Sequence, residues 1–396
     1  MKKTEALATV DPSILEKPPS QWRRLLGFQN ISAIYIFIVI FIIFSIWTPQ
    51  TFLKPQTWAN LLDTNSLLVM AALAVLVPLV TGVFNLAVGA EIQWAMALCI
   101  VLQLKPEDFP DLALALNTPW PLAVLITIVV GGLIGMVSGL VITKLRIDSF
   151  IATLGMSSIL VALTYLISAN RPLKDVQPGF HEMYGWHIPL GDFRLTFPVI
   201  VLIVIAFVVW YLLERTPVGR RMYAAGFNPD GARLSGVNVG RLQLGATIAG
   251  GLIAGVIGVL ASSKVYLAGG FGAGMLIPAL SAVFLGSTQF KGGRFNVWGT
   301  VLALYVLAVG VLGLTLVKVP DLFTDFFYGV ALIGAVAMSR WERTSKRTRA
   351  IRRATTLGAE AKAKLAAEDE AQLPPQLTPT QTALKQDGIE DQGDKP

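Results

Sequence analysis

Ten apolar runs alternate with polar segments between residues 31 and 339, and this alternation is the dominant pattern of the chain. A bilayer core of about 30 Å requires about 20 apolar residues per helix, and most of the runs approach that length. The expected helices cover residues 31–47, 61–80, 86–104, 120–143, 150–168, 195–213, 242–266, 276–286, 297–317 and 322–339. The pattern therefore predicts an all-α polytopic membrane protein with about ten transmembrane helices.

Two breaks between these apolar runs resemble each other because both contain glycine. One follows the second predicted helix at Thr81-Gly82-Val83-Phe84-Asn85, and the other is the glycine-rich run 269–274 after the seventh. Helices broken at matched positions an odd number of spans apart are typical of two inverted repeats, and such breaks usually lie beside a central pathway. We therefore expect two inverted repeats with broken helices at the centre.

Lysines and arginines are distributed unequally between the two sides that ten helices would create. With the N-terminus inside, most of them fall in cytoplasmic segments, in agreement with the positive-inside rule. We predict a cytoplasmic N-terminal segment (1–30), a transmembrane domain (31–339) and a cytoplasmic tail (340–396). The tail is polar and rich in Ala, Lys, Glu and Pro, a composition that favours disorder over most of its length.

Composition narrows the function classes. The chain has 396 residues, of which 54% are hydrophobic, and a formal net charge of +7. The basic residues lie between apolar runs without an aromatic surface, so they indicate topology rather than nucleic-acid binding. Cys99 lies alone in an apolar run, and His181 and His187 have no cysteine or carboxylate cluster nearby, so neither a disulfide nor a metal site is expected.

Glycines recur at four-residue spacing in two of the predicted helices, as Gly135-x-x-x-Gly139 and Gly251-x-x-x-Gly255. Because glycine has no side chain, such pairs let two membrane helices approach closely. We predict that these glycines serve helix packing.

The longest polar segment inside the apolar body is residues 214–241. Pro217 suits the first turn of a helix, and Asn228 can cap a second short helix that ends at Gly236. A short helix with small side chains on a membrane surface fits the cleft of a partner protein. The alternative is a solvated loop whose arginines only set topology.

Residues 215–238, RTPVGRRMYAAGFNPDGARLSGVN, resemble the cytoplasmic coupling loop of the permease subunits of ribose- and xylose-type bacterial ABC sugar importers. We therefore call residues 214–241 the coupling loop. The resemblance implies that this loop contacts a separate ATP-hydrolysing subunit and transmits its motion to the pore. The residues expected at that contact are Gly226, Asn228, Ala232, Arg233 and Gly236. ATP and Mg would bind to the partner, because this chain has no phosphate-binding loop of its own.

Three further segments resemble motifs of the same family. Residues 81–89, TGVFNLAVG, resemble its TGGIDLSVG motif, with Asn85 where aspartate is common. Residues 149–155, SFIATLG, match its PFIATLG motif, and residues 292–300, GGRFNVWGT, resemble its GGRGSVxGT turn. Residues 277–288 depart from the family's ELDAIAAVVIGGT and lack both of its acidic residues, so the identity of the substrate does not transfer.

The resemblance implies a permease in the bacterial inner membrane, with a periplasmic or lipid-anchored solute-binding protein and a second permease subunit, expected as a homodimer. The cargo class would be a pentose, hexose or polyol. Phe84, Asn85 and Glu91 are expected near the pathway, although Asn85 could instead satisfy the broken backbone and Glu91 could pair with a neighbouring helix. Two alternatives are an ion-coupled secondary transporter that uses Glu91 without an ATPase, and a membrane scaffold without a pathway.

Overall fold

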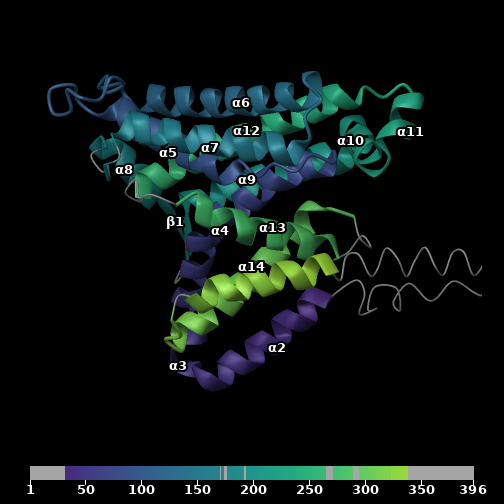
Figure 1. Cartoon of the computed structure of the whole chain (residues 1–396). Helices are drawn as coiled ribbons and strands as arrows, with labels where there is room; N and C mark the ends of the chain where they lie inside the picture. The colour runs from purple at the N-terminus through teal and green to yellow at the C-terminus, as the bar shows by residue number, and fades with distance from the viewer. Residues whose placement is uncertain are drawn as a thin grey trace, which may run out of the picture. The chain divides into compact units, whose positions relative to one another are not determined.

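The computed structural model describes residues 32–169, 171–173, 176–190, 193–264, 271–288, 294–320 and 322–337 (Figure 1). Its elements are α2 (Ser32–Trp47), α3 (Pro49–Phe52), α4 (Pro55–Val80), α5 (Val88–Gln103), α6 (Trp120–Lys144), α7 (Ser149–Ser168), α8 (Pro178–Gly185), β1 (His187–Leu190), β2 (Phe193–Thr196), α9 (Phe197–Trp210), the π-helical turn Tyr211–Arg215, α10 (Pro217–Phe227), α11 (Pro229–Leu234), α12 (Val239–Lys264), α13 (Ala273–Ser287), α14 (Val297–Leu316) and an unlabelled helix, Leu322–Ala337.

This is an all-α polytopic membrane protein. Among the described residues, six helices are long and apolar enough to cross a bilayer, and four more are apolar but shorter. Each predicted apolar run overlaps one of these helices. The N-terminal segment, the glycine run up to residue 270 and the predicted tail lie outside the described residues.

Two local features differ from the prediction. Helix α4 begins at Pro55, earlier than the apolar run, because proline suits a first helical turn and the polar residues after it continue the helix. An antiparallel hairpin, β1 with β2, follows α8 and pairs His187 with Thr196. The polarity of this segment predicted only a loop.

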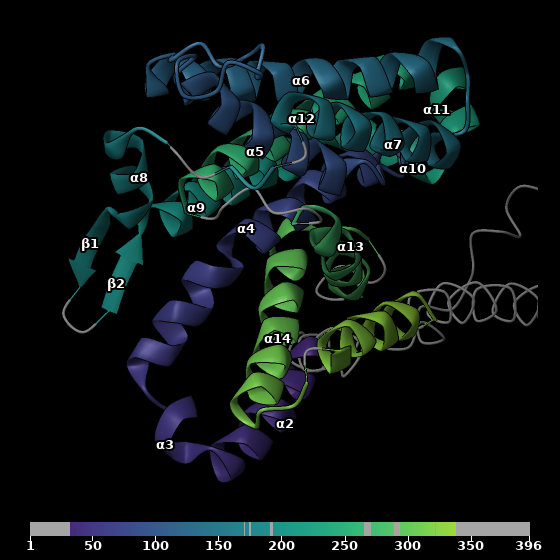
Figure 2. The same cartoon turned by 60° about the vertical axis from the view of Figure 1, so that its left-hand side comes forward.

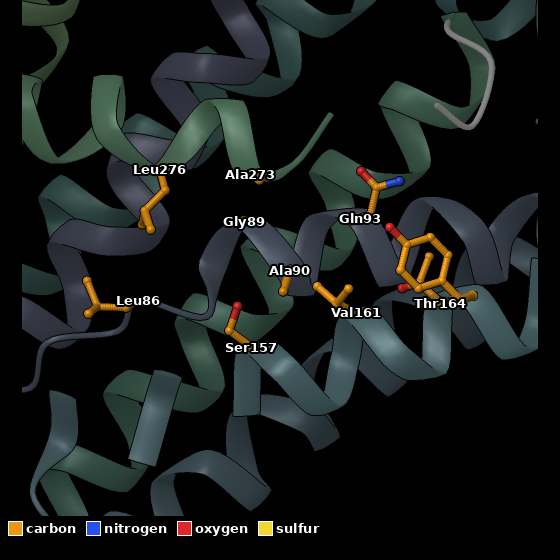
Figure 3. Close-up of a pocket in the computed structure, with 10 residues that line it drawn as sticks. Leu86, Gly89, Ala90, Gln93, Ser157, Val161, Thr164, Ala273 and Leu276 are labelled. Carbon is orange, nitrogen blue, oxygen red and sulfur yellow. The ribbon is translucent and has the colours of Figure 1, made fainter. Parts of the chain in front are cut away.

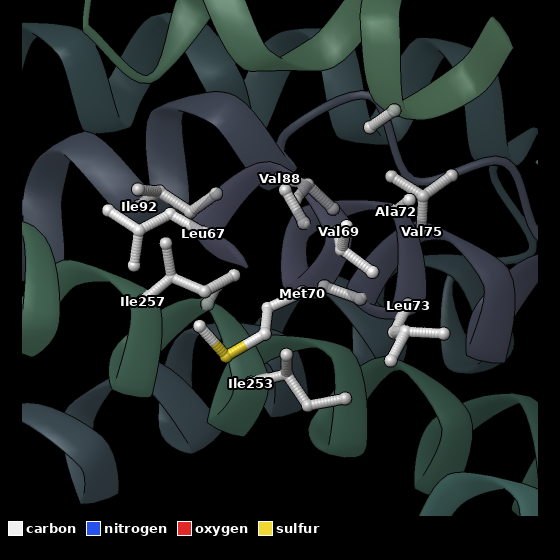
Figure 4. Close-up of a cluster of buried hydrophobic side chains, with 14 of the residues drawn as sticks. Leu67, Val69, Met70, Ala72, Leu73, Val75, Val88, Ile92, Ile253 and Ile257 are labelled. Carbon is white, nitrogen blue, oxygen red and sulfur yellow. The ribbon is translucent and has the colours of Figure 1, made fainter. Parts of the chain in front are cut away.

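Helix α4 is the centre of the core. Its residues from Val69 to Val80 are all buried, and its neighbours are α5, α9, α12, α13 and α14 (Figure 2). Met70 and Leu73 of α4 lie beside Ile253 and Ile257 of α12 (Figure 4). Since lipid tails are as apolar as these side chains, dispersion contacts in a close-packed interior, rather than transfer from water, hold such helices together.

The predicted glycine packing is confirmed in the contact between α6 and α12, which lie side by side in Figure 1. A Cβ atom on Gly131 would come within 2.6 Å of the carbonyl oxygen of Gly251. A Cβ on Gly255 would come within 3.0 Å of the Cα of Ile128. Because real Cβ atoms essentially never come within 3.0 Å of a neighbouring atom, only glycine permits the contact at Gly131, and a methyl group at Gly255 would be unusually tight.

Candidate functional site

The coupling loop folds into α10 and α11, with Pro217 in the first turn of α10 and Asn228 capping α11 as the sequence predicts. The hydroxyl oxygen of Thr216 accepts a hydrogen bond from the N–H of Gly219 at 3.2 Å, and Pro217 occupies the first turn of α10. The side-chain oxygen of Asn228 accepts from the N–H of Gly231 at 3.0 Å at the start of α11. These caps satisfy N–H groups that a short helix cannot satisfy itself.

The five coupling residues predicted from sequence lie on different sides of the loop. Asn228 and Arg233 are exposed, and Ala232 is buried against neighbouring apolar side chains. Gly236 has φ +78° and ends α11 in the left-handed region that favours glycine. Gly226 faces inward, against the end of α4. The outer side of the loop is therefore formed by a subset of these residues.

Two apolar side chains of the loop were missed by the sequence reasoning. Phe227, at the end of α10, is 65% exposed, and Leu234, at the end of α11, is 91% exposed. Large apolar side chains this accessible outside the apolar helices suggest a protein contact. Their position within an otherwise polar segment is the sequence feature that could have identified them.

The interruption after α4 brings Asn85 and Glu91 together. Gly82 has φ +86°, and no helix continues until Val88. The side-chain nitrogen of Asn85 donates to both carboxylate oxygens of Glu91, at 3.2 and 3.4 Å, and its oxygen accepts from the N–H of Ala87 at 3.0 Å. Both side chains are about 1% exposed. Asn85 therefore satisfies the broken backbone and also supplies a donor to a buried carboxyl group.

Helix α7 fixes the backbone of the same interruption. The N–H of Phe84 donates to the hydroxyl of Ser149 at 3.2 Å. The hydroxyl of Thr153 donates to the carbonyl of Phe84 at 3.1 Å and accepts from the N–H of Leu86 at 3.2 Å. Two of the motifs found in sequence, residues 81–89 and 149–155, thus meet in space.

A cavity of about 280 Å³ lies beside this meeting point, between α5, α7 and the start of α13 (Figure 3). Its lining residues are Leu86, Gly89, Ala90, Gln93, Ser157, Val161, Thr164, Tyr165, Ala273 and Leu276. The volume is just below the range for small-molecule sites, roughly 300–1,000 Å³. Phe84, Asn85 and Glu91 are not among the lining residues, although Leu86, Gly89 and Ala90 are their neighbours in sequence.

The polar groups of the cavity are an amide and hydroxyls. Gln93, Ser157, Thr164 and Tyr165 supply them, and the lining residues that the structure describes include no Asp, Glu, Lys, Arg or His. The side-chain oxygen of Gln93 also accepts from the N–H of Gly272 at 2.9 Å, which ties α5 to the start of α13. Sequence reasoning missed these residues, although each is a polar position inside an apolar run. The set can hold a neutral, hydroxyl-bearing molecule.

A second polar cluster lies at the ends of α4 and α12 that are remote from the coupling loop. Asp63 accepts from Lys264 at 3.0 Å and from the hydroxyl of Thr196 at 2.6 Å, and Lys264 lies 3.1 Å from the hydroxyl of Tyr184. Burial raises the pKa of Tyr184 above its ordinary value, against the opposite effect of its hydrogen bond with Lys264. The cluster anchors α8 and the hairpin to the helices.

Comparison with known proteins identifies relatives of the whole helical body. Residues 57–336 match a family model described as the branched-chain amino acid transport system / permease component. The chain is 27% identical to the galactose/methyl galactoside import permease MglC of Escherichia coli K12, over 82% of this chain and 98% of the relative. It is 26% identical to the fructose import permease FrcC of Rhizobium meliloti, over 78% and 84% of the two chains.

A third relative is the ribose import permease RbsC of Bacillus subtilis, which is 29% identical over 77% of this chain and 90% of its own length. No solved structure matches the chain.

Proposed function

This chain belongs to the family of transport-system permease components, and from that premise we propose that it carries a neutral monosaccharide-like solute through the bacterial inner membrane in an ATP-driven importer. The named relatives support the solute class, since their printed functions are the import of galactose, fructose and ribose. The observation that carries the proposal in this chain is the cavity between α5, α7 and α13, whose polar groups are hydroxyls and an amide. Such groups exchange hydrogen bonds with sugar hydroxyls without a charge to desolvate.

The permease makes and breaks no covalent bonds in this proposal. A separate ATPase subunit would contact the exposed side of the coupling loop at Asn228, Arg233 and Gly236, with Phe227 and Leu234 contributing apolar area. A solute-binding protein would deliver the solute on the other side of the membrane. A second permease subunit, in the simplest arrangement another copy of this chain, would complete the pore. Both termini and the coupling loop would then face the cytoplasm.

Reconstitution tests this function. The chain would be placed in proteoliposomes with its cognate ATPase and solute-binding protein, and uptake of radiolabelled galactose, fructose and ribose would be measured. We expect ATP-dependent uptake of at least one of the three, with ATP hydrolysis stimulated by the loaded binding protein. Uptake by the permease alone, without the ATPase, would contradict the proposal.

Membership of this family supports the ATP-driven importer over an ion-coupled carrier that uses Glu91. The two differ in their response to an uncoupler at constant ATP. The importer should keep its uptake, and a Glu91→Gln variant that folds should keep it as well. Collapse of uptake when the proton gradient is removed would favour the carrier.

A further inference from the structure

The inner side of the coupling loop rests directly on the interruption after α4. A Cβ atom on Gly226 would overlap the carbonyl oxygen of Val80 and would come within 3.3 Å of the N–H nitrogen of Gly82. Gly82 in turn has the left-handed φ that turns the chain out of α4. Since two close-packed backbones cannot slide past each other without a rearrangement, displacement of α10 must act on this turn.

A second connection runs through aromatic side chains. The hydroxyl of Tyr223 in α10 donates to the carbonyl of Phe295 at 2.7 Å, and the guanidinium of Arg294 lies 3.5 Å from the centre of the Tyr223 ring. The ring of Phe295 meets that of Phe284 edge-on at 5.8 Å, and Phe284 stacks on Phe84 at 6.5 Å. Continuous contacts therefore lead from the coupling loop to Phe84.

Phe84 combines a fixed backbone with an accessible side chain. Its N–H and carbonyl are both hydrogen-bonded to side chains of α7, at Ser149 and Thr153. Its side chain, in contrast, is 40% exposed and lies two residues before Leu86, which lines the cavity. A rigidly held residue with a large ring free on one side can open or obstruct a passage by changing rotamer.

We propose that Phe84 is the gate on the cytoplasmic side of the cavity, and that Tyr223 and Gly226 are positioning residues through which the coupling loop sets the gate. This inference rests on the proposed function for its direction, because the ATPase supplies the motion. Motion of the coupling loop would reach the gate by two routes. One is the backbone contact with the turn at Gly82, and the other is the series of aromatic contacts that ends at the Phe84 ring.

The gate can be tested without the ATPase. The chain has one cysteine, Cys99, which is fully buried, so a cysteine introduced at Ser157 in the cavity gives a site-specific signal. Labelling of Ser157→Cys by a membrane-impermeant maleimide is measured in inside-out vesicles. Adding Phe84→Ala should raise the labelling rate about five-fold or more. Phe326→Ala, which removes another exposed ring, is the matched control and should leave the rate unchanged. An equal rate with and without the Phe84 ring would overturn the gate.

The coupling route is tested in the full complex. In the complex that carries only Ser157→Cys, ATP and vanadate should change the labelling rate of this cysteine about five-fold or more. Tyr223→Phe removes only the hydroxyl that bonds to Phe295, so it should reduce that ATP-dependent change at unaltered ATPase binding. Gly226→Ala inserts a methyl group against the end of α4 and should reduce the same change. Gly245→Ala is the control, because open space surrounds that position in α12. Full retention of the change in both variants would overturn the route.

Failure of the two proposals is distinguishable. If wild-type proteoliposomes show no ATP-driven uptake of any sugar, the proposed function fails, whereas the labelling comparison in vesicles still reports whether Phe84 closes the cavity. If uptake is normal and the Phe84→Ala rate equals that of the Phe326→Ala control, only the gate fails.

Discussion

Gly89 and Gly272 lie in backbone contact: a Cβ atom on Gly89 would come within 2.5 Å of the carbonyl oxygen of Gly272. Gly89 belongs to the first turn of α5, and Gly272 immediately precedes α13. Each of these helices follows an interruption of the chain, and the two beginnings meet beside the cavity. The beginnings of the two helices therefore pack directly on each other.

The contact predicts a stability difference between two neighbouring glycines. Gly272→Ala places a methyl group where the carbonyl of Gly89 lies, so it should lower the free energy of unfolding by about 1–3 kcal/mol, the usual cost of overpacking. Gly274→Ala is the control, because nothing lies within 4 Å of a Cβ at that position in α13. Thermal unfolding in detergent measures both; equal midpoints would argue against a tight contact.

Because Asn85 and Glu91 form a buried pair, we predict that loss of one partner lowers stability and that a substitution of the other partner restores part of it. Asn85→Ala removes the side-chain donor that faces the Glu91 carboxyl group, and an unsatisfied buried group costs about 1–3 kcal/mol. Glu91→Gln in the same chain should recover part of this loss, because an amide is cheaper to bury than a charged group. The measurement is again thermal unfolding in detergent. Strictly additive effects of the two substitutions would show that they do not interact.

We predict that charge reversal in the coupling loop impairs assembly with the ATPase but not folding of the permease. Arg233 pairs with Asp230 at 2.9 Å, but both side chains are largely exposed, so the pair contributes little stability. Arg233→Glu should therefore leave membrane insertion intact and weaken binding of the ATPase by charge reversal at the contact.

Co-purification of the ATPase with detergent-solubilised permease measures this effect. Arg194→Glu, in β2, carries the same charge reversal outside the coupling loop and should retain the ATPase. Normal ATPase binding and full uptake in the Arg233→Glu variant would show that the ATPase contact lies elsewhere.

The polar cluster around Asp63 predicts local loosening at the far ends of the helices. Asp63→Asn keeps the shape of the side chain but removes the negative charge that holds Lys264. We expect faster hydrogen exchange in α8 and in β2, because the cluster ties them to α4 and α12. Asp111→Asn is a control, since its partner Arg171 lies in a separate and largely exposed ion pair. Unchanged exchange in the hairpin would show that its anchorage lies elsewhere.

The sequence by itself determined where the apolar helices lie and the ends of several of them. The bilayer acts as an apolar solvent, so runs of apolar residues directly encode spanning helices, and α6 and α7 coincide with the predicted runs to within a residue. Caps are also local: Thr216 and Asn228 bond to N–H groups three residues away. Glycine spacing indicated that α6 and α12 each have a face suited to close helix packing, because a helix places residues four apart on one face.

Only the tertiary structure decided which segments meet. The cavity takes residues from α5, α7 and α13, and the bond from Gly272 to Gln93 joins residues 179 positions apart. The sequence placed Asn85 and Glu91 near the pathway, yet their side chains bond to each other, and Leu86 between them lines the cavity instead. Hydropathy states that a side chain avoids water but not which neighbour it meets. That choice depends on how whole helices orient when their backbones and side chains fill the interior without voids.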